Sequence, residues 1–199
     1  MSRIWLYCIL STALLQRSVT ARVGLDPRIG EPCAAVVSHM LQAGYDVRDC
    51  VYAEPFVYWR IEHKLTWHGG RTACQQVGGD LVSIVSFGEK QLVRALSVDN
   101  RIPASAQQRA QPAGVWVGLR EQHRQNGSGW EWSDGNELLQ SDWLSDQPRP
   151  QVSRDVCAHA RYFADWDSQV VAAGWATAPC DAKMKPVCKI SRLVIFPLG

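Results

Sequence analysis

Two stretches of the chain repeat hydrophobic residues at helical spacing. In TWHGGRTACQQVGG, residues 66–79, Thr66 is placed to cap a helix whose inner face carries Trp67, Ala73, Cys74 and Val77. In SFGEKQLVRAL, which starts at Ser86, Ser86 and Glu89 form a capping box ahead of an apolar face. The pattern therefore predicts two amphipathic helices in the first half of the chain.

Short runs of β-branched and aromatic residues predict strands around these helices. The first run is residues 50–59, where Pro55 is expected to interrupt the strand. The Asn126-Gly127 pair predicts a hairpin turn, and residues 135–154 show no periodicity and predict a long irregular loop. The remaining predicted strands are DLVSI (80–84), VWVGL (115–119), WEWSD (130–134), DVCAHARYF (155–163), GWATA (174–178) and KPVCKI (185–190). A strand, two helices and then several antiparallel strands is an α+β order.

The first 21 residues have the composition of a signal peptide. Arg3 precedes an apolar run over residues 4–15, which is too short to span a bilayer of about 30 Å as a helix. Val19 and Ala21 are small residues at the positions that a signal peptidase reads, so we expect cleavage after Ala21. The mature protein is then secreted and extracellular, with no membrane span. A buried N-terminal helix or a membrane anchor is the alternative.

Composition and charge narrow the functional classes. The chain is 46% hydrophobic and 20% charged, which predicts one globular domain with accessory segments. It has 21 basic and 19 acidic residues, but Arg3 and Arg17 leave with the signal peptide, so the mature charge is close to zero. A nucleic-acid partner is therefore not expected.

The cysteines predict disulfides. Cys8 lies in the signal peptide, and six others remain: Cys33, Cys50, Cys74, Cys157, Cys180 and Cys188. An even number in a secreted chain indicates a disulfide framework, although six cysteines allow 15 pairings. No Cys-x-x-Cys motif occurs, so a zinc site or a redox motif has little support, and His63 and His68 are interpreted as ordinary surface histidines.

Five motifs in order carry a resemblance to a known family. GGDLVSIVSFGEKQLV, VWVGL, WEWSDG, DVCAHARYF with GWATAPC, and KPVCKI resemble successive regions of C-type lectin-like domains. The resemblance covers residues 50–190. It implies two helices packed on small antiparallel sheets with a long irregular loop. Residues 22–49 are then an N-terminal segment, in which AAVVSHMLQAG predicts a short helix ended by Gly44. Residues 191–199 are a C-terminal tail. The cysteine spacing is closer to layilin and chondrolectin than to short soluble lectins.

The resemblance also implies the disulfide pairs. In this family the cysteine that ends the first helix pairs with the last one, which gives Cys74–Cys188. The inner pair is Cys157–Cys180, and Cys33–Cys50 corresponds to the N-terminal bridge of long-form members. All three are interpreted as structural.

Sugar-binding members of the family hold one calcium ion in the long loop. Calcium takes six to eight oxygen ligands at about 2.4 Å. The family ligands flank a cis-proline, lie two positions before the inner cysteine, and follow a tryptophan as Asn-Asp. Here Gln147 matches the first position, before Pro148, and Asp155 matches the acid before Cys157.

The other ligand positions depart from the family pattern. Arg149 brings a positive charge where an oxygen ligand is needed, and Trp175 is followed by Ala176-Thr177 instead of Asn-Asp. At an effective dielectric of 20, a guanidinium about 4 Å from a divalent cation costs several kcal/mol. We therefore predict no calcium at this position and no other cofactor. An auxiliary loop site stays open, with carboxylates from Asp134, Glu137, Asp142 or Asp146.

Two of the degenerate site residues have alternative interpretations. Trp175 is either part of a ligand site or a core residue. Arg149 is expected to pair with Asp146 or Asp155 in place of the metal, or to be a solvated loop charge. Asn126-Gly-Ser is a glycosylation sequon, for which a plain turn is the alternative.

The resemblance predicts a secreted recognition protein that binds a protein or glycan without calcium at the usual sugar site. One alternative is a carbohydrate-binding lectin that grips an anionic glycan through arginines such as Arg149, Arg154 and Arg161. Another is a structural role in the extracellular matrix, on a mineral or on ice. Enzymatic activity is not expected, because no nucleophile–base–acid arrangement or phosphate loop stands out.

Overall fold

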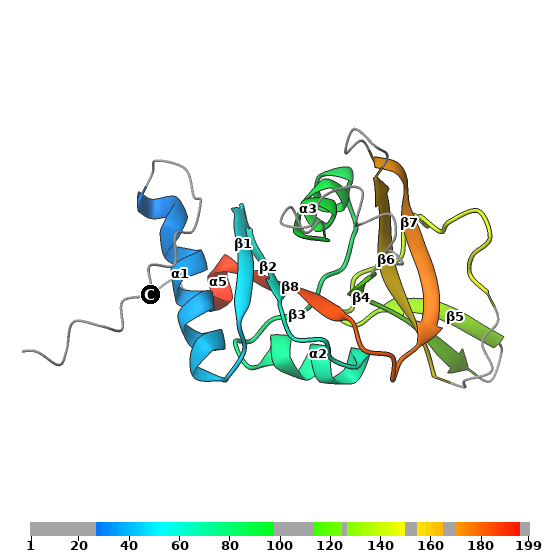
Figure 1. Cartoon of the computed structure of the whole chain (residues 1–199), viewed down its shortest axis with the longest axis horizontal. Coiled ribbons are helices and arrows are strands. Elements are labelled where there is room, and N and C mark those ends of the chain that lie inside the picture. Colours follow the sequence, from blue (N-terminus) through cyan, green and yellow to red (C-terminus); the bar gives the residue numbers. More distant parts are fainter. Residues whose placement is uncertain (1–26, 98–113, 125–126, 150–154, 165–169, 196–199) are drawn as a thin grey trace, which may run out of the picture.

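The architecture of the chain comes from a computed structural model, which describes residues 27–97, 114–124, 127–149, 155–164 and 170–195 (Figure 1). The expected signal peptide, the sequon residue Asn126 and Arg154 lie outside these ranges. Helix α3 lies on one side of the central strands and α2 on the other, while α1 and the β5–β7 region occupy opposite ends (Figure 1). None of the described helices combines the length and hydrophobicity needed to cross a membrane.

The described elements follow the predicted α+β order. The helices are α1 (Pro27–Gln42), α2 (Trp67–Gln75), α3 (Phe87–Ser97) and the short α5 (Arg192–Ile195). The strands are β1 (Val47–Ala53), β2 (Phe56–Ile61), β3 (Asp80–Leu81), β4 (Val115–Arg124), β5 (Gly127–Trp132), β6 (Val156–Ala164), β7 (Val170–Pro179) and β8 (Lys185–Ser191). The fold class expected from the sequence is therefore confirmed.

The strands join into one connected sheet through the last strand. Their order is β1-β2-β8-β4-β6-β7, with β3 beside β8 and β5 beside β4. Among the described strands, β4 and β8 form the parallel pair, through Val115 opposite Lys185, and the other pairs are antiparallel. The small antiparallel sheets that we expected are linked by β8, which pairs with both β2 and β4.

Two local predictions were incomplete. The N-terminal helix was expected only before Gly44, but α1 already begins at Pro27 and ends two residues before Gly44, whose φ is +85°. Its residues Cys33, Val36 and Met40 are buried in the core, so this segment packs with the rest of the fold. The run around Pro55 forms two strands, β1 and β2, which pair as a hairpin.

Helix α2 begins as its sequence predicts. Thr66 has extended backbone angles, and its hydroxyl accepts a hydrogen bond from the Gly69 backbone N–H at 3.1 Å. This bond satisfies one of the amide groups that every helix leaves unpaired at its N-terminus. The cap places Trp67 and Cys74 on the buried face of the helix.

Thr66→Ala should lower the free energy of unfolding by about 1 kcal/mol, because the Gly69 N–H loses its intramolecular acceptor. Urea unfolding monitored by tryptophan fluorescence measures the change. Thr72→Ala, at an exposed position on the same helix, is the control and should change stability by less than about 0.5 kcal/mol. Equal losses in the two variants would contradict a capping role for Thr66.

The cap of helix α3 has a second role that the sequence did not reveal. The Ser86 hydroxyl accepts the Glu89 backbone N–H at 3.2 Å, as the capping box predicts. The Glu89 carboxylate accepts the Val85 N–H at 2.9 Å and also pairs with Lys189 of β8. Both charged side chains are buried, so the first turn of α3 is tied to the central strand by an ion pair.

Three disulfides connect the elements. They are Cys33–Cys50, Cys74–Cys188 and Cys157–Cys180, which are the pairs that the family resemblance implies. The first ties α1 to β1, the second ties α2 to β8, and the third joins β6 to the end of β7. Covalent links therefore hold α1 and α2 to the sheet and join β6 to the residue that follows β7.

Candidate functional site

The long loop after β5 is fixed against β7 by backbone hydrogen bonds. The Trp175 N–H donates to the Asp142 carbonyl at 2.7 Å, and the Leu144 N–H donates to the Trp175 carbonyl at 3.0 Å. A side chain at Gly174 would lie 2.8 Å from the Asp142 carbonyl oxygen, so only glycine allows the loop to approach this closely. The residues that follow, up to Arg149, are thereby held beside β7.

Gln147 and Thr177 form the centre of the predicted sugar site. The peptide bond between Gln147 and Pro148 is cis. Gln147 Oε1 accepts the Thr177 backbone N–H at 2.9 Å, and the Thr177 hydroxyl lies 2.9 Å from the same oxygen. The Arg149 backbone N–H also points at this oxygen, at 3.3 Å. The side-chain oxygen of Gln147 is thus surrounded by hydrogen-bond donors.

Arg149 pairs within its own loop. Its guanidinium forms an ion pair with Asp146, and its Nε donates to the Asp146 carbonyl at 3.3 Å. Of the interpretations left open by the sequence, the structure therefore supports pairing with Asp146. The Arg149 side chain is 62% exposed, so the pair lies at the surface.

Asp155 is oriented toward α2 and β4. Its carboxylate accepts hydrogen bonds from His68 Nε2 at 2.7 Å and from Arg120 Nε at 2.9 Å. Partial burial acts to raise the pKa of Asp155, but the hydrogen bonds from His68 and Arg120 outweigh it and hold this pKa below its usual value. The acid that the resemblance assigns to the calcium shell is thus engaged by two donors from other elements.

Trp175 is a core residue. It is 2% exposed, and its ring packs edge to face against Trp132 and Trp143 at centroid distances of 5.3 and 5.7 Å. The next residue, Ala176, is also buried. Placing Trp175 in a ligand site was therefore wrong, because the indole is covered by its neighbours, and the core interpretation holds.

Three of the four loop carboxylates considered for an auxiliary calcium site, those of Asp134, Asp142 and Asp146, bind other side chains. Asp134 accepts hydrogen bonds from Ser83 and from Asn136. Asp142 pairs with Lys90 at 2.8 Å, and Asp146 pairs with Arg149. Within the described residues, these acids do not converge on a common point.

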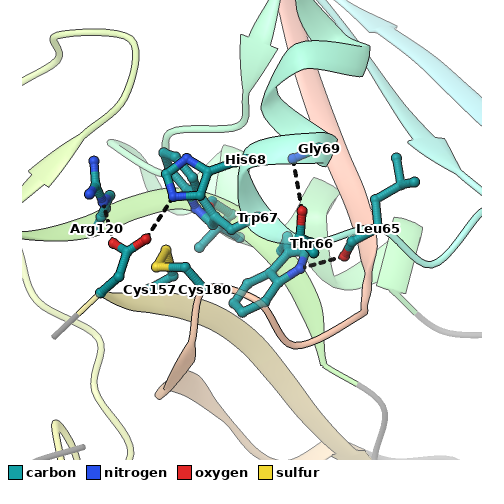
Figure 2. Close-up of a disulfide and its surroundings, with 11 residues drawn as sticks. Leu65, Thr66, Trp67, His68, Gly69, Arg120, Cys157 and Cys180 are labelled. Atoms are coloured by element: carbon teal, nitrogen blue, oxygen red, sulfur yellow. Dashed lines mark hydrogen bonds and ion pairs between the residues drawn. A yellow bond between two sulfur atoms is a disulfide. The ribbon is translucent and has the colours of Figure 1, made fainter. Parts of the chain in front are cut away.

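One polar cluster was missed by the sequence. His68, Arg120 and Asp155 meet beside the Cys157–Cys180 disulfide (Figure 2). The Arg120 guanidinium lies 5.9 Å from the Trp67 ring centroid, in cation–π geometry. His68 and Asp155 are 87 residues apart, and no local pattern relates them. Only the packing of α2 against β4 and β6 brings these groups together.

The arginines proposed for an anionic glycan do not form a described cluster. Arg154 lies outside the described residues, and Arg161 on β6 is partly buried. Arg149 is exposed but already paired with Asp146. Of these three arginines, only Arg149 is both described and exposed, and Asp146 balances its charge.

Comparisons with known proteins agree with the fold. The family model described as "Lectin C-type domain" matches residues 63–190. "Lithostathine-2" of Mus musculus is 29% identical over 135 residues, which cover 67% of this chain and 68% of that protein. "C-type mannose receptor 2" of Homo sapiens is 26% identical over 131 residues, but the chain spans only 7% of that protein. A solved structure, titled "Crystal structure analysis of calcium-independent type II antifreeze protein", matches with a TM-score of 0.51 and 20% identity, over 71% of this chain and 91% of that one.

Proposed function

Because the chain belongs to the C-type lectin domain family, we propose that it is a recognition module that binds its ligand without calcium at the usual sugar site. The ligand is an extracellular protein or a glycan met by another surface. We propose no enzymatic activity. The three disulfides support a secreted protein, because such bonds persist in oxidising compartments. Residues 1–21 serve as the signal peptide in this proposal.

The observation that carries the proposal is the hydrogen bonding of Gln147 Oε1. An amide oxygen has two lone pairs, and here the Thr177 N–H donates to one of them, while the Thr177 hydroxyl lies between this oxygen and the Arg149 carbonyl, at 2.9 and 3.0 Å. Calcium needs lone pairs directed at the metal, whereas these donors place positive hydrogens around the oxygen. The oxygen that would bind the cation instead holds the loop to β7.

The surrounding charges support the same conclusion. Arg149 adds a guanidinium to the loop, and its partner Asp146 offsets that charge. Asp155 would have to leave His68 and Arg120 to reach a cation. A calcium ion would thus have to break existing bonds in several places and would gain few oxygen ligands in return. The antifreeze neighbour, described in its own title as calcium-independent, is a precedent for such a form of the fold.

The alternative ligand, an anionic glycan bound by arginines, has less support than a protein or glycan bound by another surface. Arg149 is the exposed arginine described near the loop, and Asp146 already neutralises it. Binding of a sulfated or uronic-acid glycan that falls steeply with salt would favour the alternative. Binding that persists at high salt would favour the first proposal.

Calorimetric titration of calcium into the protein should give no binding heat, and the midpoint of thermal unfolding should be the same in calcium and in chelator. The reason is that the loop oxygens are already bound by donors within the chain. Saturable heat with micromolar to millimolar affinity would contradict the proposal.

A matched variant makes this result informative. The triple substitution Arg149→Asp, Ala176→Asn and Thr177→Asp restores the missing oxygens of the family pattern. It also removes the Thr177 hydroxyl and the Arg149 guanidinium, while the two backbone N–H groups that face Gln147 stay in place. It should acquire calcium binding, and at ten times the Kd the ion would stabilise the variant by about 1.4 kcal/mol. Arg149→Ala alone is the control and should not bind, because it adds no oxygen ligand.

A further inference from the structure

Three large apolar side chains are exposed around the start of α3 and on the long loop. Phe87, the first residue of α3, is 75% exposed, and Val85, just before the helix, is 39% exposed. Leu139, in the loop after β5, is 73% exposed. Single exposed apolar residues are ordinary, whereas apolar residues that gather in one place mark interaction sites.

Two side-chain contacts hold the long loop against the segment that contains the start of α3. Asn136 Nδ2 donates to Ser83 Oγ at 2.9 Å, which joins the loop to the residues before the helix. Lys90 Nζ donates to Asp142 Oδ1 at 2.8 Å, which joins the loop to the first half of the helix. The two segments therefore run side by side between these contacts.

The three apolar residues lie between the two contacts. Val85 and Phe87 fall between them on the α3 side, and Leu139 falls between them on the loop side. Their side chains thus share one region of the surface, which we call the apolar strip (Val85, Phe87 and Leu139).

The fold gives these side chains no route into the core. A helix turns by about 100° per residue, so Phe87 lies about 180° around α3 from Leu96, which is buried. Leu138, next to Leu139, is the loop leucine that packs against the core. Turning either segment inward would therefore expose a residue that is now packed.

Both sides of the strip are anchored. On the α3 side, the capping bond of Ser86 with Glu89 and the ion pair of Glu89 with Lys189 hold the first turn of the helix. On the loop side, the Asp142 carbonyl accepts the Trp175 N–H at 2.7 Å. A surface that is already held in place loses little conformational entropy when a partner binds.

The charged groups beside the strip carry a net negative charge. Lys90 is balanced by Asp142. Asp134 accepts hydrogen bonds from a serine and an asparagine side chain, which are neutral. Glu137 is exposed, and within the described ranges neither Glu137 nor Asp134 forms an ion pair. A complementary partner therefore carries positive charge beside its apolar contact.

We propose that the apolar strip is the docking surface for a protein partner, whose contact face places an aromatic or aliphatic side chain next to lysine or arginine. This inference rests on the proposed function and narrows its ligand from a protein or a glycan to a protein. Phe87 is the central contact, because aromatic residues are enriched in the cores of protein interfaces. Glu137 pairs with the partner's cation at the rim.

The chemistry of the strip favours a protein over a glycan. The side chains of Val85, Phe87 and Leu139 have no hydrogen-bonding groups, whereas a sugar buried against them would leave hydroxyl groups without partners. The charges of Asp134 and Glu137 also repel an anionic glycan. An apolar side chain of a protein gains free energy by leaving water and needs no hydrogen bond.

The test selects peptides from a phage-displayed library of random dodecapeptides on the full, oxidised chain in the presence of a calcium chelator. We expect the enriched peptides to combine an aromatic or aliphatic residue with lysine or arginine. Fluorescence anisotropy of synthetic copies should give a Kd that rises with salt, because the rim charges are exposed. No enrichment above a selection on the empty support, or enriched peptides that lack basic residues, would overturn the proposal.

Matched variants locate the binding. Phe87→Ser and Leu139→Ser should each raise the Kd of the synthetic peptides at least about tenfold, because each removes apolar contact area. Glu137→Lys should also raise the Kd and flatten its dependence on salt. Leu193→Ser is the control, since it removes a 56% exposed side chain of α5 at the α1 end of the fold (Figure 1), and it should leave the Kd unchanged. All four side chains are exposed, so each variant should keep the parent's unfolding midpoint.

The remaining outcomes separate this inference from the proposed function. Peptides that bind the parent and Phe87→Ser equally would refute docking at the strip and leave the calcium result intact. Saturable calcium heat would refute the proposed function, while the peptide measurements in chelator test the strip alone. Self-association in sedimentation velocity that Phe87→Ser abolishes would assign the strip to a second copy of the chain and overturn the proposal.

Discussion

Lys189→Met should lower the free energy of unfolding by about 3 to 5 kcal/mol, because it leaves the Glu89 carboxylate buried without its cation. The exposed fractions of the two side chains are 7% and 8%. Lys189 Nζ contacts Glu89 Oε1 at 2.5 Å and lies 4.3 Å from the Phe56 ring centroid. Urea unfolding at neutral pH measures the loss.

The cause of this loss can be isolated by a double-mutant cycle. Burial acts to raise the pKa of Glu89, yet the hydrogen bond from Lys189 and the Val85 N–H hold this pKa below its usual value, so the carboxylate is charged at neutral pH. Glu89→Gln combined with Lys189→Met removes both charges and keeps one acceptor oxygen for the donors that face Glu89, the Tyr58 hydroxyl and the Val85 N–H. The double variant should therefore be more stable than Lys189→Met by at least about 2 kcal/mol.

Lys185→Met provides a matched control on the same strand. Lys185 Nζ bonds Glu62 at 2.9 Å, but these side chains are 27% and 23% exposed. Water can solvate Glu62 after the substitution, so the loss should be about 1 kcal/mol. A Lys189→Met variant that loses no more than the Lys185→Met variant would show that burial of the pair does not matter.

Acidification from pH 6.5 to 4 should cost about 3 kcal/mol of stability through His159 alone. This residue of β6 is 7% exposed and packs edge to face on Trp116 at 6.1 Å between ring centroids. Within the described part of the chain, its Nδ1 has no hydrogen-bond partner. Burial, and next the charge of Arg161, lower the pKa of His159 to about 4 from 6.5.

The direction of the pH effect follows from these two values. Above pH 6.5 the imidazole is neutral in both states, and stability is complete. As the pH falls toward 4, the unfolded chain takes up a proton that the folded protein resists, so the folded state loses stability progressively. Carboxylates with lowered pKa values, such as Glu62 and Glu89, lose their contribution only at lower pH, below their usual value of 4.5.

Urea unfolding at several pH values between 7 and 4.5 tests this prediction. His159→Gln should flatten the decline in stability above pH 5, whatever its effect at pH 7, because the titrating group is gone. His63→Gln removes an exposed histidine and should leave the decline in place. If the parent and His159→Gln decline equally, His159 is not the group responsible.

The sequence by itself determined the features that depend on neighbours within a few residues. The Thr66 cap, the contact of Ser86 with Glu89 and the hairpin that pairs Arg124 with Gly127 are all present. A hydrogen bond across three or four residues is encoded by those residues alone, so local patterns predict it. The order of motifs and cysteines determined the family in the same way. The sequence also shows directly that Ala176-Thr177 follows Trp175 where the family pattern has Asn-Asp.

Tertiary structure decided which charged groups meet. Glu89 looked like a helix cap, but it also neutralises Lys189, which is 100 residues away. Asp155 looked like a calcium ligand, yet the packing of α2 and β4 surrounds it with His68 and Arg120. Of the two interpretations of Trp175, its burial supports the core residue. Coulombic and packing energies depend on distance in space, and a local sequence pattern carries no information about partners brought together by folding.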